Sequence, residues 1–119
     1  MYPPPPEEVI QELANRVLEL VSHGEYVIHM RFENGTKLSF SAPFRFAEGK
    51  DLSGAPVFEF PLSESRLVRT LGCQVRKVKC EADGTLELHF SNGDILVVYA
   101  NDPAYEAYTL TVGEKEYIV

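Results

Sequence analysis

The feature that most constrains this chain is a pair of apolar segments separated by an Asn-Gly turn. Residues 86–91 alternate apolar and polar side chains, as in a strand with one buried face, because successive side chains point to opposite faces. Asn92-Gly93 then favours a tight reversal, since both residues tolerate positive φ. Residues 95–100 are apolar on both faces. The sequence therefore predicts a β-hairpin whose second strand is covered on both sides.

An earlier segment repeats this pattern at a constant offset. Residues 28–40, centred on Asn34-Gly35, match residues 86–98 at seven positions, which predicts a duplicated β unit. We expect the outer face of the first copy to be exposed to solvent. The outer face of the second copy should be covered, either by an N-terminal helix or by a partner. The outward residues are Lys37, Ser39 and Ser41 in the first copy and Ile95, Val97 and Tyr99 in the second.

The remaining segments fit one domain of 119 residues. Glu7 and Glu8 followed by apolar residues at helical spacing predict a helix that ends before Gly24. The expected class is α+β, with this helix packed on one twisted antiparallel sheet built from the two related hairpin halves, and closure into a partial barrel left open. The predicted segments are a proline-rich arm at 1–6, a helix at 7–23, a first β half at 26–60, a short helix at 63–71 and a second β half at 73–119.

Composition and charge indicate where the protein is located and which types of partner it can bind. The formal charge of −7 disfavours nucleic-acid binding, because an acidic protein repels phosphates, although Arg66 to Lys79 holds five basic residues and no acidic one. No membrane contact is expected, since no apolar run approaches about 20 residues and the N-terminus lacks a signal-peptide pattern. Cys73 and Cys80 lie on opposite faces of a predicted strand, in no metal or redox spacing. Reduced thiols and a cytoplasmic location are therefore expected.

The sequence carries no motif for catalysis or for a cofactor. It has no His-Glu-x-x-His, Cys-x-x-Cys, nucleophile-elbow or dinucleotide-binding glycine pattern. We therefore predict no enzyme activity, no cofactor and no metal site. His23, His29 and His89 are expected at the surface, because His29 and His89 fall on the polar faces of their strands and His23 lies near a helix end. The alternative is a small enzyme or metal site in which His29 and His89 converge with Glu87, which requires the two repeated strands to be neighbours.

Polar and aromatic residues gather around the turn that follows the second hairpin. Asp102, Tyr105, Glu106 and Tyr108 combine carboxylates with large apolar area, which suits a surface that binds a basic protein. A structural alternative is that Tyr105 anchors the turn and Glu106 accepts hydrogen bonds from its amides. Together with Tyr99, these residues form the predicted binding site.

The second hairpin and the residues after it also carry a short motif. It reads Leu86-x-Leu88-x-Phe90-x-Asn92-Gly93, then Leu96-x-Val98, then Asp102-Pro103-x-Tyr105-Glu106-x-Tyr108. This motif resembles that of a family of small bacterial proteins of unknown function, in which a tryptophan more often stands at the position of Tyr108. Such proteins are sometimes encoded beside secreted toxins as immunity proteins, and the resemblance implies no catalytic residues.

The expected function is non-enzymatic protein binding. Its most concrete form is an immunity-type inhibitor that covers the surface of a basic bacterial toxin. The alternative is a structural module that associates with its own copy, as a homodimer, through the apolar outer face of the second hairpin.

Overall fold

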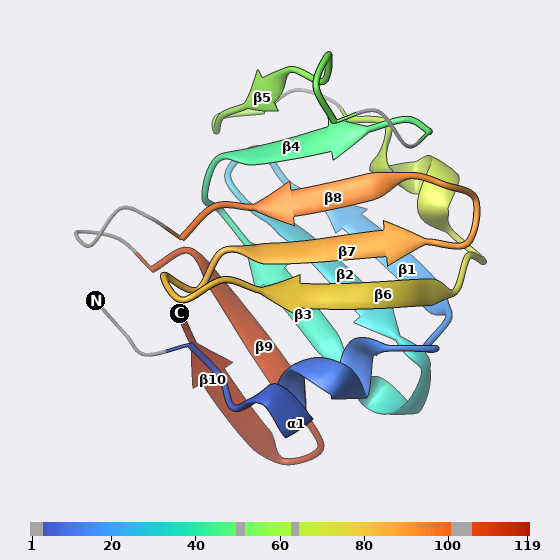
Figure 1. Ribbon diagram of the computed structural model, residues 1–119. Coiled ribbons are helices and arrows are strands. Elements are labelled where there is room, and N and C mark those ends of the chain that lie inside the picture. The colour runs from blue at the N-terminus through green and yellow to red at the C-terminus, as the bar shows by residue number, and fades with distance from the viewer. Residues whose placement is uncertain (1–3, 50–51, 63–64, 101–105) are drawn as a thin grey trace.

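The computed structural model describes residues 4–49, 52–62, 65–100 and 106–119, which form two five-stranded sheets (Figure 1). All strand pairs among these residues are antiparallel. In spatial order, the first sheet holds β1 (Leu18–His23), β2 (Ile28–Phe32), β3 (Lys37–Phe40), β9 (Tyr108–Val112) and β10 (Lys115–Ile118). The second sheet holds β5 (Val57–Phe58), β4 (Phe44–Ala47), β8 (Ile95–Val98), β7 (Leu86–Phe90) and β6 (Val75–Cys80).

The helical elements are short. The helix α1 (Glu7–Ile10) continues into the 3-10 turn η1 (Gln11–Leu13), and together they bury Ile10 and Leu13 beside β6. The predicted α+β class is therefore confirmed. Two more 3-10 turns are η2 (Glu33–Gly35) and η3 (Leu67–Thr70). Of the short helix predicted at 63–71, the structure describes residues 65–71, and only η3 within them is helical.

The prediction of one helix over residues 7–23 is wrong beyond Leu13, because Leu18–His23 is a strand. Asn15 adopts a φ of 67°, a left-handed conformation that an α-helix cannot continue. A bulge between Leu18 and Leu20 then brings Leu18 into the core and lets Val21 pack against it. This three-residue spacing imitates a helical stripe in the sequence.

The two predicted hairpins are present and have the same register. Ile28 pairs with Phe40 in the first hairpin, and Leu86 pairs with Val98 in the second, at matching positions of the sequence pattern. They lie in different sheets, so the single predicted sheet is in fact two. The predicted halves also exchange strands, since β4 and β5 join the second sheet and β9 and β10 join the first.

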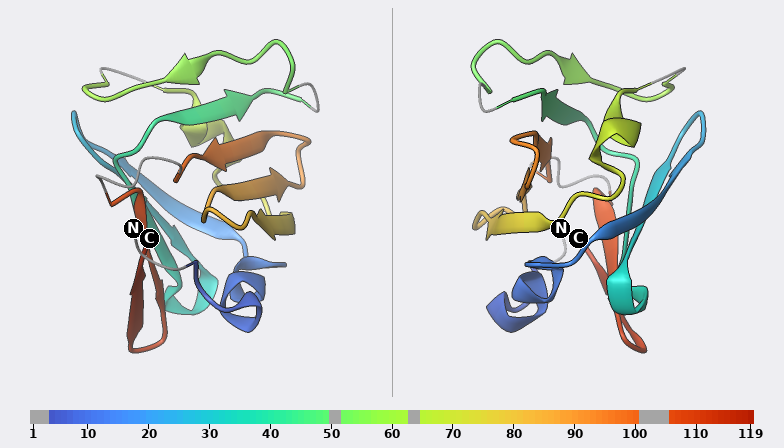
Figure 2. Two further views of the ribbon diagram at one scale, coloured as in Figure 1. Left: turned by 60° about the vertical axis from the view of Figure 1, so that its left-hand side comes forward. Right: turned by 90° about the vertical axis from the view of Figure 1, so that its right-hand side faces the viewer.

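The inner faces of the two sheets enclose the core. Figure 2 shows the sheets packed face to face with crossing strands, and α1 beside β6 at one end. Phe40 of β3 and Phe44 of β4 are both buried, and their rings meet edge to face at 5.3 Å between centroids. The chain passes from the first sheet to the second between these two residues, so the aromatic pair fixes the corner.

The outer faces differ as the sequence predicts. On the first sheet Lys37 is exposed, and His29 bonds Ser39 at 2.6 Å. On the second sheet Ile95 and Val97 are buried, and their cover differs from the expected N-terminal helix. The residues that pack over them with Ala47 are Leu52, Ala55 and Tyr99, the first two from the connection between β4 and β5. No helix in the described ranges has the length and apolarity needed to cross a bilayer.

Candidate functional site

Three of the five predicted binding residues, Tyr99, Glu106 and Tyr108, lie within the described part of the chain. Tyr99 is half-buried on the outer side of the second sheet, and Glu106 is exposed just before β9. Tyr108 is only 2% exposed, so it offers almost no area to a partner. Asp102 and Tyr105 lie outside the described residues.

Tyr108 acts from the interior of the fold. Its hydroxyl donates to the carbonyl oxygen of Gly84 at 2.7 Å and lies 3.8 Å from Cys80 Sγ. Burial raises the pKa of both the Tyr108 phenol and the Cys80 thiol. Gly84 belongs to the turn between β6 and β7, so Tyr108 holds that turn in place.

A hollow of about 350 Å³ lies on the outer face of the second sheet beside Tyr99. It sits between the β4–β5 connection, which contributes Leu52, and the β6–β7 turn, which contributes Glu81 and Asp83. Among the described residues, its lining consists of Arg45, Leu52, Glu81, Asp83, Thr85, Glu87, Val97 and Tyr99. Sequence reasoning assigned only Tyr99 of this group to a site.

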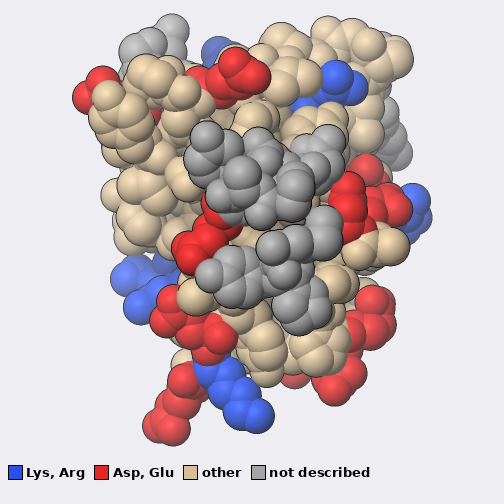
Figure 3. Space-filling view, turned by 90° about the vertical axis from the view of Figure 1, so that its left-hand side faces the viewer, with Lys and Arg blue, Asp and Glu red and all other residues tan. Residues whose placement is uncertain are grey.

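Three carboxylates give the hollow its acidic character. Asp83 Oδ1 accepts from the backbone N–H of Thr85 at 2.9 Å, and Glu87 Oε2 lies 2.6 Å from His89 Nε2. Glu81 is exposed. Figure 3 shows the side of the molecule that carries the β6–β7 turn, where more acidic than basic side chains are visible. Such a surface attracts cations.

Of the described residues that line this hollow, Arg45 is the one with a cationic side chain. It lies opposite Val97 in the β4–β8 pairing and therefore shares the outer face. Its Nε atom is buried and has no hydrogen-bond partner. A buried donor without an acceptor costs about 1–3 kcal/mol, so this arrangement is not explained by stability alone.

An ionic network around the buried Asp94 holds the start of the β4–β5 connection, the segment that brings Leu52 to the hollow. Asp94 is fully buried and accepts from Arg69 Nε at 2.6 Å, from Asn92 Nδ2 at 2.8 Å and from the backbone N–H of Gly49 at 2.9 Å. The hydrogen bond to Asp94 raises the pKa of Arg69. Because Gly49 begins the β4–β5 connection, the network anchors the segment that covers the second sheet.

The same network changes the interpretation of the basic segment. Arg69 also pairs with Glu48 at 2.5 Å, and Arg66 Nε lies 2.8 Å from a Glu48 oxygen. Two of the five basic residues from Arg66 to Lys79 are thus engaged by carboxylates within the chain. Asp94 follows an Asn-Gly turn, and no signal in the sequence pointed to its burial.

Comparison with known proteins supplies a family. The model of the Family of unknown function (DUF6188) matches residues 9–119. The chain belongs to DUF6188. No curated protein and no solved structure matches the chain. Functional proposals for this DUF6188 member therefore rest on its own residues.

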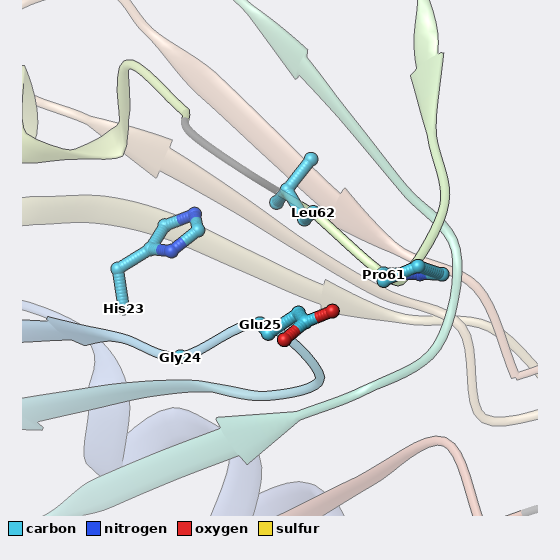
Figure 4. A pocket seen from close by; sticks show the side chains of 5 residues that line it. All are labelled: His23, Gly24, Glu25, Pro61 and Leu62. Atoms are coloured by element: carbon cyan, nitrogen blue, oxygen red, sulfur yellow. The ribbon is translucent and has the colours of Figure 1, made fainter.

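The histidines of this DUF6188 member do not converge. His29 lies on β2 in the first sheet, whereas His89 lies on β7 in the second and pairs with Glu87, so the metal site with both histidines is wrong. No group of three His, Cys, Asp or Glu side chains within the described ranges is placed to hold a metal ion. His23 is exposed and lines a separate hollow of about 530 Å³ with Gly24, Glu25, Pro61 and Leu62 (Figure 4).

Proposed function

We propose that the chain is a non-enzymatic protein-binding domain whose acidic face recognises a basic partner. The acidic face is defined by Glu81, Asp83 and Glu87 around the β6–β7 turn. The observation that carries the proposal is that these carboxylates line one hollow together with Tyr99. Carboxylates beside an aromatic ring combine charge complementarity with the apolar area that interfaces use.

The charge balance favours a basic partner. The chain carries a net charge of −7, and within the described residues Arg66 and Arg69 are already bound to carboxylates of the same chain. An acidic field accelerates encounter with a cationic surface and repels acidic competitors. Selectivity for basic proteins follows without any catalytic group.

In its most concrete form, the domain is an immunity-type inhibitor in the bacterial cytoplasm. It would act by covering the functional surface of a basic toxin, through steric exclusion and charge pairing. Cys73 and Cys80 are free thiols, which fits a reducing compartment. The resemblance of the C-terminal motif to that of small bacterial proteins that sometimes act as immunity proteins also supports this proposal.

We also propose that the two hairpins are copies of one ancestral β unit. Their strands pair in the same register, from Ile28–Phe40 and Leu86–Val98 to Met30–Leu38 and Leu88–Leu96. Self-association through the second outer face receives no such support. Ile95 and Val97 are buried under Leu52 and Ala55, so the apolar surface on which that alternative depends is occupied.

The experiment starts by capturing proteins from an extract of the source organism on the immobilised chain at low salt. Each captured protein is then purified and its affinity measured by calorimetry at about 50 and about 300 mM NaCl, since salt screens exposed charges over about 10 Å or less. A basic partner whose affinity falls with salt is expected. Capture of acidic proteins alone, or an affinity that ignores salt, would contradict the proposal.

Charge reversal locates the interface. The double variant Glu81→Lys with Asp83→Lys is expected to weaken binding by about tenfold or more. The matched control reverses Glu114 and Glu116, two exposed carboxylates of the β9–β10 hairpin, and should bind within about twofold of the wild type. Glu106→Lys tests the residue that the sequence selected. Equal loss in the two double variants would leave only a non-specific charge effect.

A further inference from the structure

Arg45 is an unpaired cation in an acidic hollow. No side-chain hydrogen bond or ion pair joins its guanidinium to any described residue, and its Nε is buried. Three carboxylates line the same hollow. If Arg45 served to pair with one of them, we would expect its side chain to adopt a rotamer that makes this ion pair. Its guanidinium is instead available to an acceptor from outside.

The carboxylates also retain free acceptor atoms. Asp83 uses Oδ1 and Glu87 uses Oε2 in bonds within the chain, so their second oxygens have no described partner. The side-chain carboxylate of Glu81 makes no hydrogen bond to the described residues, although its backbone pairs with Thr85 and Gly84. The described lining therefore offers several free acceptors and one free donor group, and it carries three carboxylates against one guanidinium.

The walls suit a long, partly apolar side chain. Leu52, Val97 and the ring of Tyr99 line the hollow, and an aromatic ring attracts a cation placed over its face. A volume of about 350 Å³ is at the low end of the range for ligand sites, enough for one extended side chain. Lysine and arginine have an apolar stem that packs against such walls and a charged head.

We propose that the hollow receives one lysine or arginine side chain of the basic partner. The cation lies among the free oxygens of Glu81, Asp83 and Glu87, and its stem packs along Tyr99. A backbone carbonyl of the same partner segment accepts a hydrogen bond from Arg45. This inference rests on the proposed function and adds the group that is recognised.

The test uses small probes on the full ¹⁵N-labelled chain, followed by NMR. N-acetyl-arginine methylamide carries both the cation and the carbonyls, and it should produce saturable shifts at the amides of Thr85, Glu87, Val97 and Tyr99. A probe of this size is expected to have a dissociation constant of about 1 mM. N-acetyl-citrulline methylamide has nearly the same shape without the charge and should bind at least about fivefold more weakly.

Two variants separate the roles of the residues. Glu87→Gln should weaken the arginine probe by about threefold or more. N-acetyl-arginine methylamide should bind the wild type more tightly than n-butylguanidinium, a cation without a carbonyl. Arg45→Met should remove this difference, because the carbonyl of the arginine probe then has no hydrogen-bond donor. Each variant is checked for an unchanged unfolding midpoint, and Lys115→Met, an exposed cation on β10, serves as the control for Arg45→Met.

Several outcomes would overturn the inference. The first two are the absence of saturable shifts at about 50 mM probe and equal affinity for the citrulline and arginine probes. The others are shifts centred on residues outside the hollow and tighter binding of N-acetyl-glutamate methylamide than of the arginine probe, which would make Arg45 part of an anion site. If the probes fail while Glu81→Lys with Asp83→Lys still weakens the captured partner, only the side-chain pocket is refuted. If the affinity of the partner is unchanged by that charge reversal, the proposed function is refuted regardless of the probe results.

Discussion

The hydroxyl of Tyr108 donates to the carbonyl oxygen of Gly84 across 2.7 Å and thereby joins β9 of the first sheet to the β6–β7 turn of the second. Both residues are buried. The turn that presents Glu81 and Asp83 is therefore held from the core by a tyrosine of the other sheet, and its position depends on how the sheets pack together.

Removing this hydroxyl should loosen the turn. Tyr108→Phe leaves the Gly84 carbonyl without its donor, and we expect a loss of about 1–2 kcal/mol in the free energy of unfolding. Urea denaturation measures this loss, and amide exchange at Thr85 should accelerate. Tyr26→Phe is the control, because Tyr26 is 62% exposed. Equal stabilities of the two variants would show that the bond contributes nothing.

Gly84 cannot be replaced by a residue with a side chain. Its φ is +96°, and an added Cβ would lie 2.7 Å from Val119 Cγ1 and 3.3 Å from Ala100 Cβ. Gly84→Ala should therefore cost about 3 kcal/mol, from backbone strain and overpacking together. Gly113→Ala is the matched control, since its φ is +62° but nothing lies within 4 Å of the added atom. Its cost should be near 1 kcal/mol, and a similar cost at both positions would argue against the clash.

The ionic network should stabilise the cover of the second sheet. Arg69→Met removes the cation from the fully buried Asp94, and we expect the unfolding midpoint to fall by several degrees. Thermal unfolding measures it. Arg66→Met removes a 70% exposed partner of Glu48 and should cost less than about 0.5 kcal/mol. Tolerance of Arg69→Met would mean that Asn92 and Gly49 satisfy Asp94 without it.

Alkaline pH should destabilise the fold through Cys80 and Tyr108. Burial raises their pKa values above the ordinary 9.0 and 10.0, so the folded chain keeps protons that the unfolded chain loses. Their contribution is complete below about pH 9 and is lost as the pH rises further. Urea unfolding between about pH 8 and 11 should show a steeper decline for the wild type than for Cys80→Ala with Tyr108→Phe. Parallel declines would contradict this assignment.

Local turn chemistry explains what the sequence could predict. Asn34 and Gly35 both have positive φ, at 61° and 74°, whereas in the second turn only Gly93 does, at 93°. Each reversal uses the conformational freedom of its Asn-Gly pair. The register of each hairpin follows from residues within a few positions of its turn. The wet and covered outer faces could be predicted for the same reason, because they follow from alternation along single strands.

Features that depend on distant residues were not predictable in this way. The pairing of β3 with β9 divides the strands between two sheets, and nothing near Lys37–Phe40 indicates it. The buried carboxylate of Asp94 receives hydrogen bonds from Arg69, 25 positions earlier, and from Gly49, 45 positions earlier. The hollow at Arg45 likewise combines β4, β7 and β8 with two connections, whereas the sequence suggested a site at one turn.

The pairing of β3 with β9 also has a consequence for biosynthesis. All strands of the second sheet leave the ribosome before β9 has been made, and until then one edge of β3 exposes unpaired backbone groups. Open strand edges recruit strands of other nascent molecules, and contacts between distant residues form slowly. Soluble yield should therefore depend on translation speed and chaperone supply more than on the stability of the finished fold.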